Sequence, residues 1–416
     1  MWIVKFNFRR FNMNTKISAA VASAALVLGA TSANAGIIIP AGEWTLDVNG
    51  NVNVYVTAHN ADDANAITGG TTPTSDTRGE SDSQSINTGL LPAWLGFTGT
   101  TRQNDLDVSF TISMQPNVSS NDPMGDSPDS AACATTAAAT TVACGNDGVA
   151  WRQAFLTFGD ASWGTVKMGK DIGIFAKNAI LSDMTLLGVG AGQSTRSGGN
   201  FTNGGIGTGY IYPAWKGQVA YTTPSMNGLQ GTIGVTNPNQ GTNATLNQDR
   251  LGVEAEVVYT FAAGKVWVSG ASYDVTTATG SYDATALDIG VNFNVGNLGL
   301  TAYYYDADGA GTTLFHLAGA NGNAERESDG GYVQATYVIP TGTKLGVSYG
   351  ISNLDLASGE AASPLVEENK RWTVGAYHPL TKHLNLVAEY NNMESESHNN
   401  LSNDADSISL GAILFF

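Results

Sequence analysis

The side chains in this sequence that could perform chemistry are few and scattered. Of the five histidines, no two have the HExxH spacing of a zinc protease, and none lies beside a Ser or Cys elbow. The stretches "DADG" (306–309) and "NDAD" (403–406) have calcium-like carboxylate spacing but lack the rest of an EF-hand loop. The glycine-rich "GVGAGQ" (188–193) follows no βαβ unit, which argues against a nucleotide site. We therefore predict no enzyme, no cofactor and no metal.

The pattern of charged side chains favours a role in ion selectivity over a role in catalysis. Many alternate with apolar residues, and successive side chains of a strand point to opposite faces, so such charges share the polar face. In a water-filled pore, inward charged side chains and the pore diameter select the ions that pass. The pattern places the following residues on that face: Asp105, Asp107, Glu254, Glu256, Asp288, Glu389, Arg152, Lys167, Lys216, Lys344 and Arg371.

Strands must position these charges, because period-2 alternation dominates the sequence. It is clear in 44–56, 106–114, 253–259, 287–293, 345–351, 384–390 and 408–416. Seven short turns are expected at 99–103, 159–162, 225–228, 262–264, 295–297, 340–343 and 379–382. They alternate with eight longer polar segments at 59–83, 116–150, 171–210, 237–250, 275–284, 307–328, 354–367 and 394–404. This order predicts sixteen strands of about ten residues each.

Short turns at one end and long loops at the other are typical of an outer-membrane β-barrel. A soluble β-sandwich also has alternating strands, but sixteen strands with one polar face each leave too few residues for any core except a shared outer one. Aromatic residues gather near strand ends, as an interfacial girdle requires: Trp94, Trp163, Tyr221, Tyr259, Tyr337, Trp372 and Tyr390. We predict an all-β, 16-stranded antiparallel transmembrane barrel over residues 36–416, with the final strand closing against the first.

The N-terminal segment predicts export. Residues 13–35 combine one lysine, an apolar stretch and a small-residue cleavage site, so 1–35 read as a signal peptide and 1–12 as a possible over-extended start. The signal holds four basic and no acidic residues, which leaves a mature chain with 15 basic and 36 acidic residues. Such a negative charge argues against nucleic acid as a partner.

The two cysteines, Cys133 and Cys144, enclose the short stretch "CATTAAATTVAC". An exported chain meets an oxidising compartment, which favours a disulfide between them. Two free or separately paired thiols are the alternative.

Four segments carry a resemblance to a known family. "WLGFTG" (94–99), "RQAFLTFGDASWGTVKMGKDIGIF" (152–175), "RWTVGAYHPLTKHLNLVAEYNN" (371–392) and the C-terminal Phe416 occur in this order. The sequence resembles the general trimeric porins of Gram-negative outer membranes over essentially the whole mature chain. The resemblance implies an outer-membrane homotrimer that contacts lipid and lipopolysaccharide. It also implies that the barrel-assembly machinery recognises Phe416.

The resemblance further implies a third loop that folds into the barrel and narrows it, here near 171–210. That loop offers the acids Asp171 and Asp183, and the opposite wall offers Arg152, Lys167 and Lys216. Together with Asp105, Asp107, Glu254 and Glu256 these residues are the predicted lumen and constriction set. Because inward acids outnumber bases, we expect a passive pore for ions and small hydrophilic solutes with a weak preference for cations.

Two other functions remain open at this stage. A substrate-specific channel for sugars or peptides could use Tyr303, Tyr305 and Tyr332 as a stacking track. A surface adhesin without a pore would share the same strand pattern. Saturable block by a sugar would indicate the first, and absence of conductance in planar bilayers would indicate the second.

Overall fold

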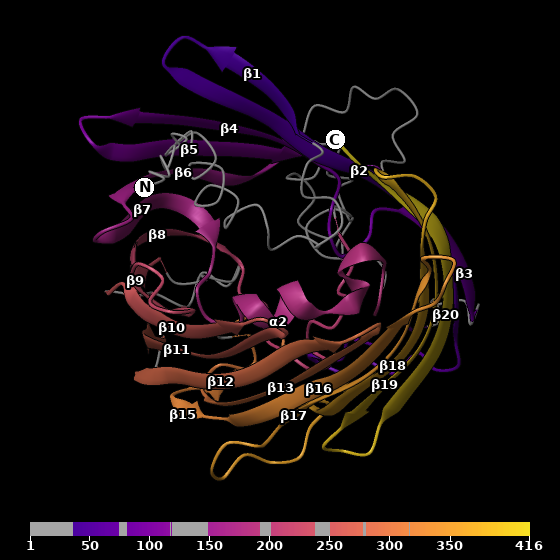
Figure 1. The fold of residues 1–416 in the computed structure, drawn as a ribbon. Coiled ribbons are helices and arrows are strands. Elements are labelled where there is room, and N and C mark those ends of the chain that lie inside the picture. The colour runs from indigo at the N-terminus through magenta and orange to yellow at the C-terminus, as the bar shows by residue number, and fades with distance from the viewer. Residues whose placement is uncertain are drawn as a thin grey trace, which may run out of the picture.

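One large antiparallel sheet forms nearly the whole described structure. The computed structural model describes residues 36–74, 81–116, 118, 149–191, 201–237, 250–277, 280–315 and 317–416. Within them, sixteen strands pair in sequence and the last pairs with the first, which gives the predicted closed barrel. Figure 1 shows the ring of strands with the short helix α2 (Lys177–Ser182) inside it. No helix in these ranges is long and apolar enough to cross a membrane.

The barrel strands have these bounds: β2 (Trp44–Ala61), β4 (Trp94–Gln103), β5 (Leu106–Gln115), β6 (Ala150–Asp160), β7 (Gly164–Ile172), β8 (Trp215–Thr222), β9 (Leu229–Thr236), β10 (Gly252–Phe261), β11 (Gly264–Thr276), β12 (Ser281–Val295), β13 (Leu298–Asp308), β16 (Glu327–Val338), β17 (Lys344–Leu354), β18 (Val366–Pro379), β19 (Leu384–Ser397) and β20 (Ser402–Phe415). β1 (Ile37–Ala41) and β3 (Asp82–Asn87) pair with parts of β2. A small hairpin joins β14 (Ala320–Asn321) to β15 (Ala324–Glu325).

The alternation seen in the sequence sorts the side chains between two environments. Apolar residues on the outer face are exposed in the isolated chain, for example Val54, Leu156, Val257, Ile289 and Leu410. On the inner face the same strands carry tyrosines and polar groups that are buried. A barrel with apolar residues outside and polar residues inside is stable in lipid hydrocarbon, where every backbone N–H and C=O group must also be hydrogen-bonded.

The two ends of the barrel wall meet at β2. β20 pairs with the second half of β2, and Phe416 exchanges two backbone hydrogen bonds with Gly50, at 2.8 and 3.0 Å. β1 then pairs with the first half of β2 on the same edge, directly beyond the end of β20. Figure 1 shows the C-terminus beside β2. The apolar final strand, β20, therefore closes the barrel against β2, as predicted.

Several connections differ from the predicted ones. The turn between β4 and β5 is Asn104–Asp105, both with positive φ (49° and 62°), and not 99–103, which continue β4. This is the two-residue hairpin geometry that matches the twist of antiparallel strands. The expected loops at 275–284 and 394–404 are largely strand, because β11 and β12 extend into the first and β19 and β20 into the second. Polar composition predicted loops there, but paired strands can carry polar residues once they leave the apolar belt.

Candidate pore constriction

The connection between β7 and β8, residues 173–214, is called the third loop here. It contains α2 (Lys177–Ser182) and the 3-10 helix η2 (Met184–Leu187), and both helices bury residues against the barrel interior. Tyr332 of β16 donates to the Ala179 carbonyl at 2.7 Å, and Tyr55 of β2 donates to the Leu187 carbonyl at 2.7 Å. The loop thus lies inside the barrel along the wall formed by β10 to β20 and β2.

Glu254 of β10 holds the start of this loop. Its carboxylate accepts the backbone N–H groups of Ile174 and Phe175, at 2.6 and 3.0 Å. It also accepts the Lys216 ammonium at 2.7 Å and the Tyr273 hydroxyl. Glu254 and Lys216 are both almost fully buried. A buried ion pair persists only when further hydrogen bonds satisfy its remaining groups, which the loop backbone does here.

Glu256, two residues further along β10, holds α2. It accepts the Lys177 ammonium at 2.9 Å and a short hydrogen bond from the Asn178 amide. Asn178 in turn accepts from Lys265 of β11. Alternation along β10 therefore supplies two carboxylates at consecutive inward positions. One binds the backbone at the start of the loop, and the other binds side chains of α2.

The middle of the loop is held by β18 and β19. Asp183 caps η2 by accepting from the Thr185 N–H at 2.9 Å, accepts the Tyr210 hydroxyl at 2.9 Å, and lies 3.7 Å from the Arg371 guanidinium. Glu389 accepts the N–H groups of Val189 and Gly190, at 2.8 and 2.9 Å. Carboxylates that accept several backbone N–H groups are strong anchors, because such bonds are charge-assisted.

Two glycines, one on a barrel strand and one in the connection between β3 and β4, let the third-loop backbone come close. A Cβ on Gly350 of β17 would lie 2.0 Å from the Thr208 carbonyl oxygen, and one on Gly89 would lie 2.1 Å from the Gly188 carbonyl oxygen. Real Cβ atoms do not approach that closely, so only glycine fits at these two contacts.

The wall of β5 to β8 carries a different set of charges. Lys167 forms a short ion pair with Asp171, and Gln153 donates to the same carboxylate at 3.0 Å. Next to them, a register shift between Ser113 and Met114 of β5 leaves Arg152 of β6 without a cross-strand partner. A bulge of this kind re-aims side chains. As a result Arg152 and Gln153 both face inward, although they are consecutive.

These positions correct several sequence expectations. Asp105 does not lie on a strand face, because it occupies the exposed β4–β5 turn. Asp107 lies beside that turn and pairs with Arg102 at 2.7 Å, far along the strand from the third loop. Asp171 belongs to β7 rather than to the loop. Asp183 faces Arg371 and not Arg152 or Lys216, because the loop turns its acidic side to the wall.

The predicted tyrosine track is absent, because its three side chains are buried. Tyr303, Tyr305 and Tyr332 are buried at 5%, 0% and 3% exposure, and Tyr332 packs under α2, so these three do not form an open stacking track. Phe416 completes the closing seam. Cys133, Cys144 and residues 1–35 lie outside the described residues. His59, expected in a loop, is an inward residue of β2 at 3% exposure.

The connection between β13 and β16, residues 309–326, also folds inward and is called the sixth loop. The Thr313 carbonyl accepts from Tyr212 N–H at 2.8 Å, and Phe315 packs edge-on against Phe175 of the third loop, with centroids 5.7 Å apart. Arg326 ties this loop to the neighbouring connection through Glu360. That hydrogen bond lowers the pKa of the Glu360 carboxyl. The sequence carries no periodic signal for such an inward loop.

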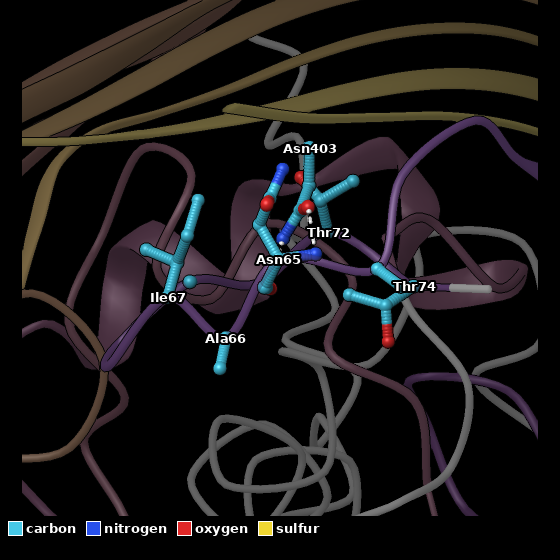
Figure 2. A pocket seen from close by; sticks show the side chains of 8 residues that line it. Asn65, Ala66, Ile67, Thr72, Thr74 and Asn403 are labelled. Atoms are coloured by element: carbon cyan, nitrogen blue, oxygen red, sulfur yellow. Dashed lines mark hydrogen bonds between the residues drawn. The ribbon is translucent and has the colours of Figure 1, made fainter. Parts of the chain in front are cut away.

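The first long connection lines the same end of the barrel with neutral groups. Asn65 and Asn403 exchange hydrogen bonds at 3.0 and 2.8 Å beside a cavity of about 590 Å³ (Figure 2). The described lining contains amides, hydroxyls and small apolar groups, among them Ala66, Ile67, Thr72 and Thr74. Nowhere in the described ranges do three His, Cys, Asp or Glu side chains come together as a metal site requires.

A closed sixteen-stranded barrel with a loop held inside it is the architecture of a pore, and the comparison with known families agrees. The family model described as Gram-negative porin matches residues 22–398, which is most of the chain. The chain belongs to the Gram-negative porin family. This porin is accordingly a protein of the Gram-negative outer membrane, with its short turns toward the periplasm and its long loops outside.

Solved structures share the fold at low sequence identity. The outer-membrane channel DcaP of Acinetobacter baumannii is 17% identical with a TM-score of 0.66, and the match covers 92% of this chain and 100% of that one. Salmonella typhi OmpF is 15% identical with a TM-score of 0.58, covering 91% and 100%. OmpT of Vibrio cholerae, in a trimer form, is 14% identical with a TM-score of 0.55, covering 90% and 99%. No curated protein sequence matches the chain.

Proposed function

We propose that this porin is a passive diffusion channel for ions and small hydrophilic solutes, and a channel rather than an enzyme. The observation that carries the proposal is the third loop, which carboxylates of β10 and β19 hold inside the barrel through the backbone of the loop itself. A loop fixed in this way narrows the lumen while the polar face of the remaining wall stays available to water and solutes.

We further propose that its cation preference is weak. At the third loop nearly every acid is matched by a base: Glu254 by Lys216, Glu256 by Lys177, Asp171 by Lys167 and Asp183 by Arg371. Paired charges cancel at the distance of a passing ion, so the constriction contributes little net field. The excess acid lies elsewhere, as at Asp47 and Asp105, and in the net negative charge of the chain.

The zero-current potential across a planar bilayer under a KCl gradient tests both statements. We expect ohmic, single-step conductance and a small potential of the cation-selective sign, which shrinks further as salt screens the outer charges over about 8–10 Å. Absence of conductance would refute the channel. A potential of the anion-selective sign would refute the assignment of selectivity and would point to Arg152 as the governing charge.

The remaining expectations concern export and assembly. We propose residues 1–35 as a signal peptide and 36–416 as the barrel domain. We also propose a homotrimer in contact with lipid and lipopolysaccharide, assembled by the barrel-assembly machinery through Phe416; the trimer form of the similar OmpT supports the oligomeric state. Cross-linking of the purified porin, followed by electrophoresis without heating, tests the trimer.

A sugar-specific channel is disfavoured because its proposed tyrosines are buried, Tyr332 of them beneath α2. No feature of the described residues favours a peptide as substrate.

A further inference from the structure

Arg152 is an inward cation with which no carboxylate of the described residues pairs, whereas Lys167, Lys216 and Arg371 each have an acidic partner. No Asp or Glu oxygen in these ranges comes within the 4.0 Å that defines an ion pair. One hydrogen bond is present, in which Arg152 Nη1 donates to the Tyr212 hydroxyl at 3.3 Å. Yet the residue is only 8% exposed. A buried charge without a partner is costly, so its retention in the fold needs a reason.

Aromatic rings surround this guanidinium. Arg152 Cζ lies 4.5 Å from the centre of the Phe201 ring and 5.7 Å from that of Trp215. Phe201 stacks on Tyr212 with centroids 5.9 Å apart. Contacts with ring faces fix the plane of the guanidinium but leave free the N–H groups along its edge, which is the geometry that binds a carboxylate with two parallel hydrogen bonds.

A cavity of about 260 Å³ lies against this group, at the external end of β6. The described lining offers donors, namely Arg152, Lys170 and the indole of Trp215, whose Nε1 is buried without a partner. Apolar surface completes it through Phe201, Ile206 and Leu314. No described acid lines the cavity. Donors on one side and apolar surface on the other select a small anion with an apolar body.

We propose that this cavity is a binding site for small organic carboxylates, with Arg152 as the carboxylate-binding residue and Trp215 as a second donor. The proposal rests on the proposed function in that Arg152 is an inward residue of the channel wall, and it goes beyond that function because a passive pore needs no built pocket. A wall arginine that only repels cations would stand exposed, whereas this one is enclosed.

Benzoate is a suitable probe, because it pairs a planar carboxylate with a flat apolar ring. Titration calorimetry on the purified, natively folded porin in detergent measures its affinity, and planar bilayers measure its effect on single-channel current. We expect saturable binding, together with a benzoate-dependent block of current. Benzyl alcohol, which lacks the charge, and inorganic phosphate, which lacks the apolar body, should each bind at least tenfold more weakly.

Three variants make the test specific. Arg152→Gln should weaken benzoate at least tenfold, and Trp215→Phe should weaken it severalfold while keeping the ring. Lys344→Gln is the matched control, because Lys344 is also an inward cation on an aromatic ring, 5.0 Å from the Tyr377 centroid. It should leave binding unchanged. Migration before and after heating verifies that each variant is folded.

Each result bears on the proposal. Equal binding of benzyl alcohol, equal loss in the Lys344 variant, or unchanged binding in a folded Arg152→Gln porin would overturn it. So would absence of saturable benzoate binding to the unmodified porin. Because open-channel conductance is recorded first, loss of the channel function itself is read separately: a porin that conducts without binding benzoate refutes only the pocket.

Discussion

Replacing Glu254 by leucine should release the start of the third loop. The change removes the acceptor of the Ile174 and Phe175 N–H groups and leaves the Lys216 ammonium buried without its partner at 2.7 Å. Removing one member of a buried ion pair costs about 3–5 kcal/mol. Since about 1.4 kcal/mol corresponds to a tenfold change in an equilibrium constant, the released state should gain population by roughly a hundred- to several-thousand-fold.

Single-channel recording and hydrogen exchange measure this effect. We expect larger and noisier open-channel currents in the Glu254→Leu porin, together with faster exchange of the Ile174 and Phe175 amides. The double variant Glu254→Leu with Lys216→Met is the control, because it removes the unpaired charge along with the pair. It should recover much of the stability but not the two backbone hydrogen bonds. A folded Glu254→Leu porin with unchanged current noise and unchanged exchange would refute the view that this carboxylate holds the loop.

Three further predictions concern other parts of the chain. Deleting Phe416 should block outer-membrane assembly, because the residue completes the seam with Gly50; normal yield of heat-modifiable barrel from the truncated chain would contradict this. The pKa of Glu360 is lowered by Arg326, so the contact stabilises the sixth loop above the usual Glu pKa of about 4.3 and is lost as pH falls through the lower folded value. The protection factor of the Arg326 amide, which corrects for slower intrinsic exchange at low pH, should therefore fall on acidification. Glu360→Gln should show the lower protection already at pH 7, whereas equal protection in both proteins at pH 7 would exclude this role. Cys133 and Cys144 should be bridged, and a bridge closing a loop of this length contributes about 2–3 kcal/mol if unstrained; two alkylatable thiols in the unreduced protein would refute the bridge.

The sequence by itself determined the fold and the class of function. Alternation of apolar and polar residues fixes which face of each strand meets lipid, because the side-chain period of a strand is two whatever its neighbours are. The alternation in the final strand, with Leu410 and Phe416 on its apolar face, therefore predicted that this strand belongs to the closed barrel wall. The same rule placed Glu254, Glu256 and Arg371 inside, and the four family-like segments predicted an inward third loop.

Only the tertiary structure decided what the inward charges do. Strand period says that Glu254 points inward but not that a loop far along the chain supplies its hydrogen-bond partners. For the same reason the pairing of Asp183 with Arg371, and the enclosure of Arg152 by Phe201 and Trp215, could not be predicted. The two-residue turn at Asp105 removes the facing that alternation predicts, and the bulge beside Arg152 brings Arg152 and its neighbour Gln153 to the same face. Which face of its strand a side chain occupies follows from local backbone geometry. The groups with which that side chain forms hydrogen bonds or ion pairs depend on where the loops cross the lumen.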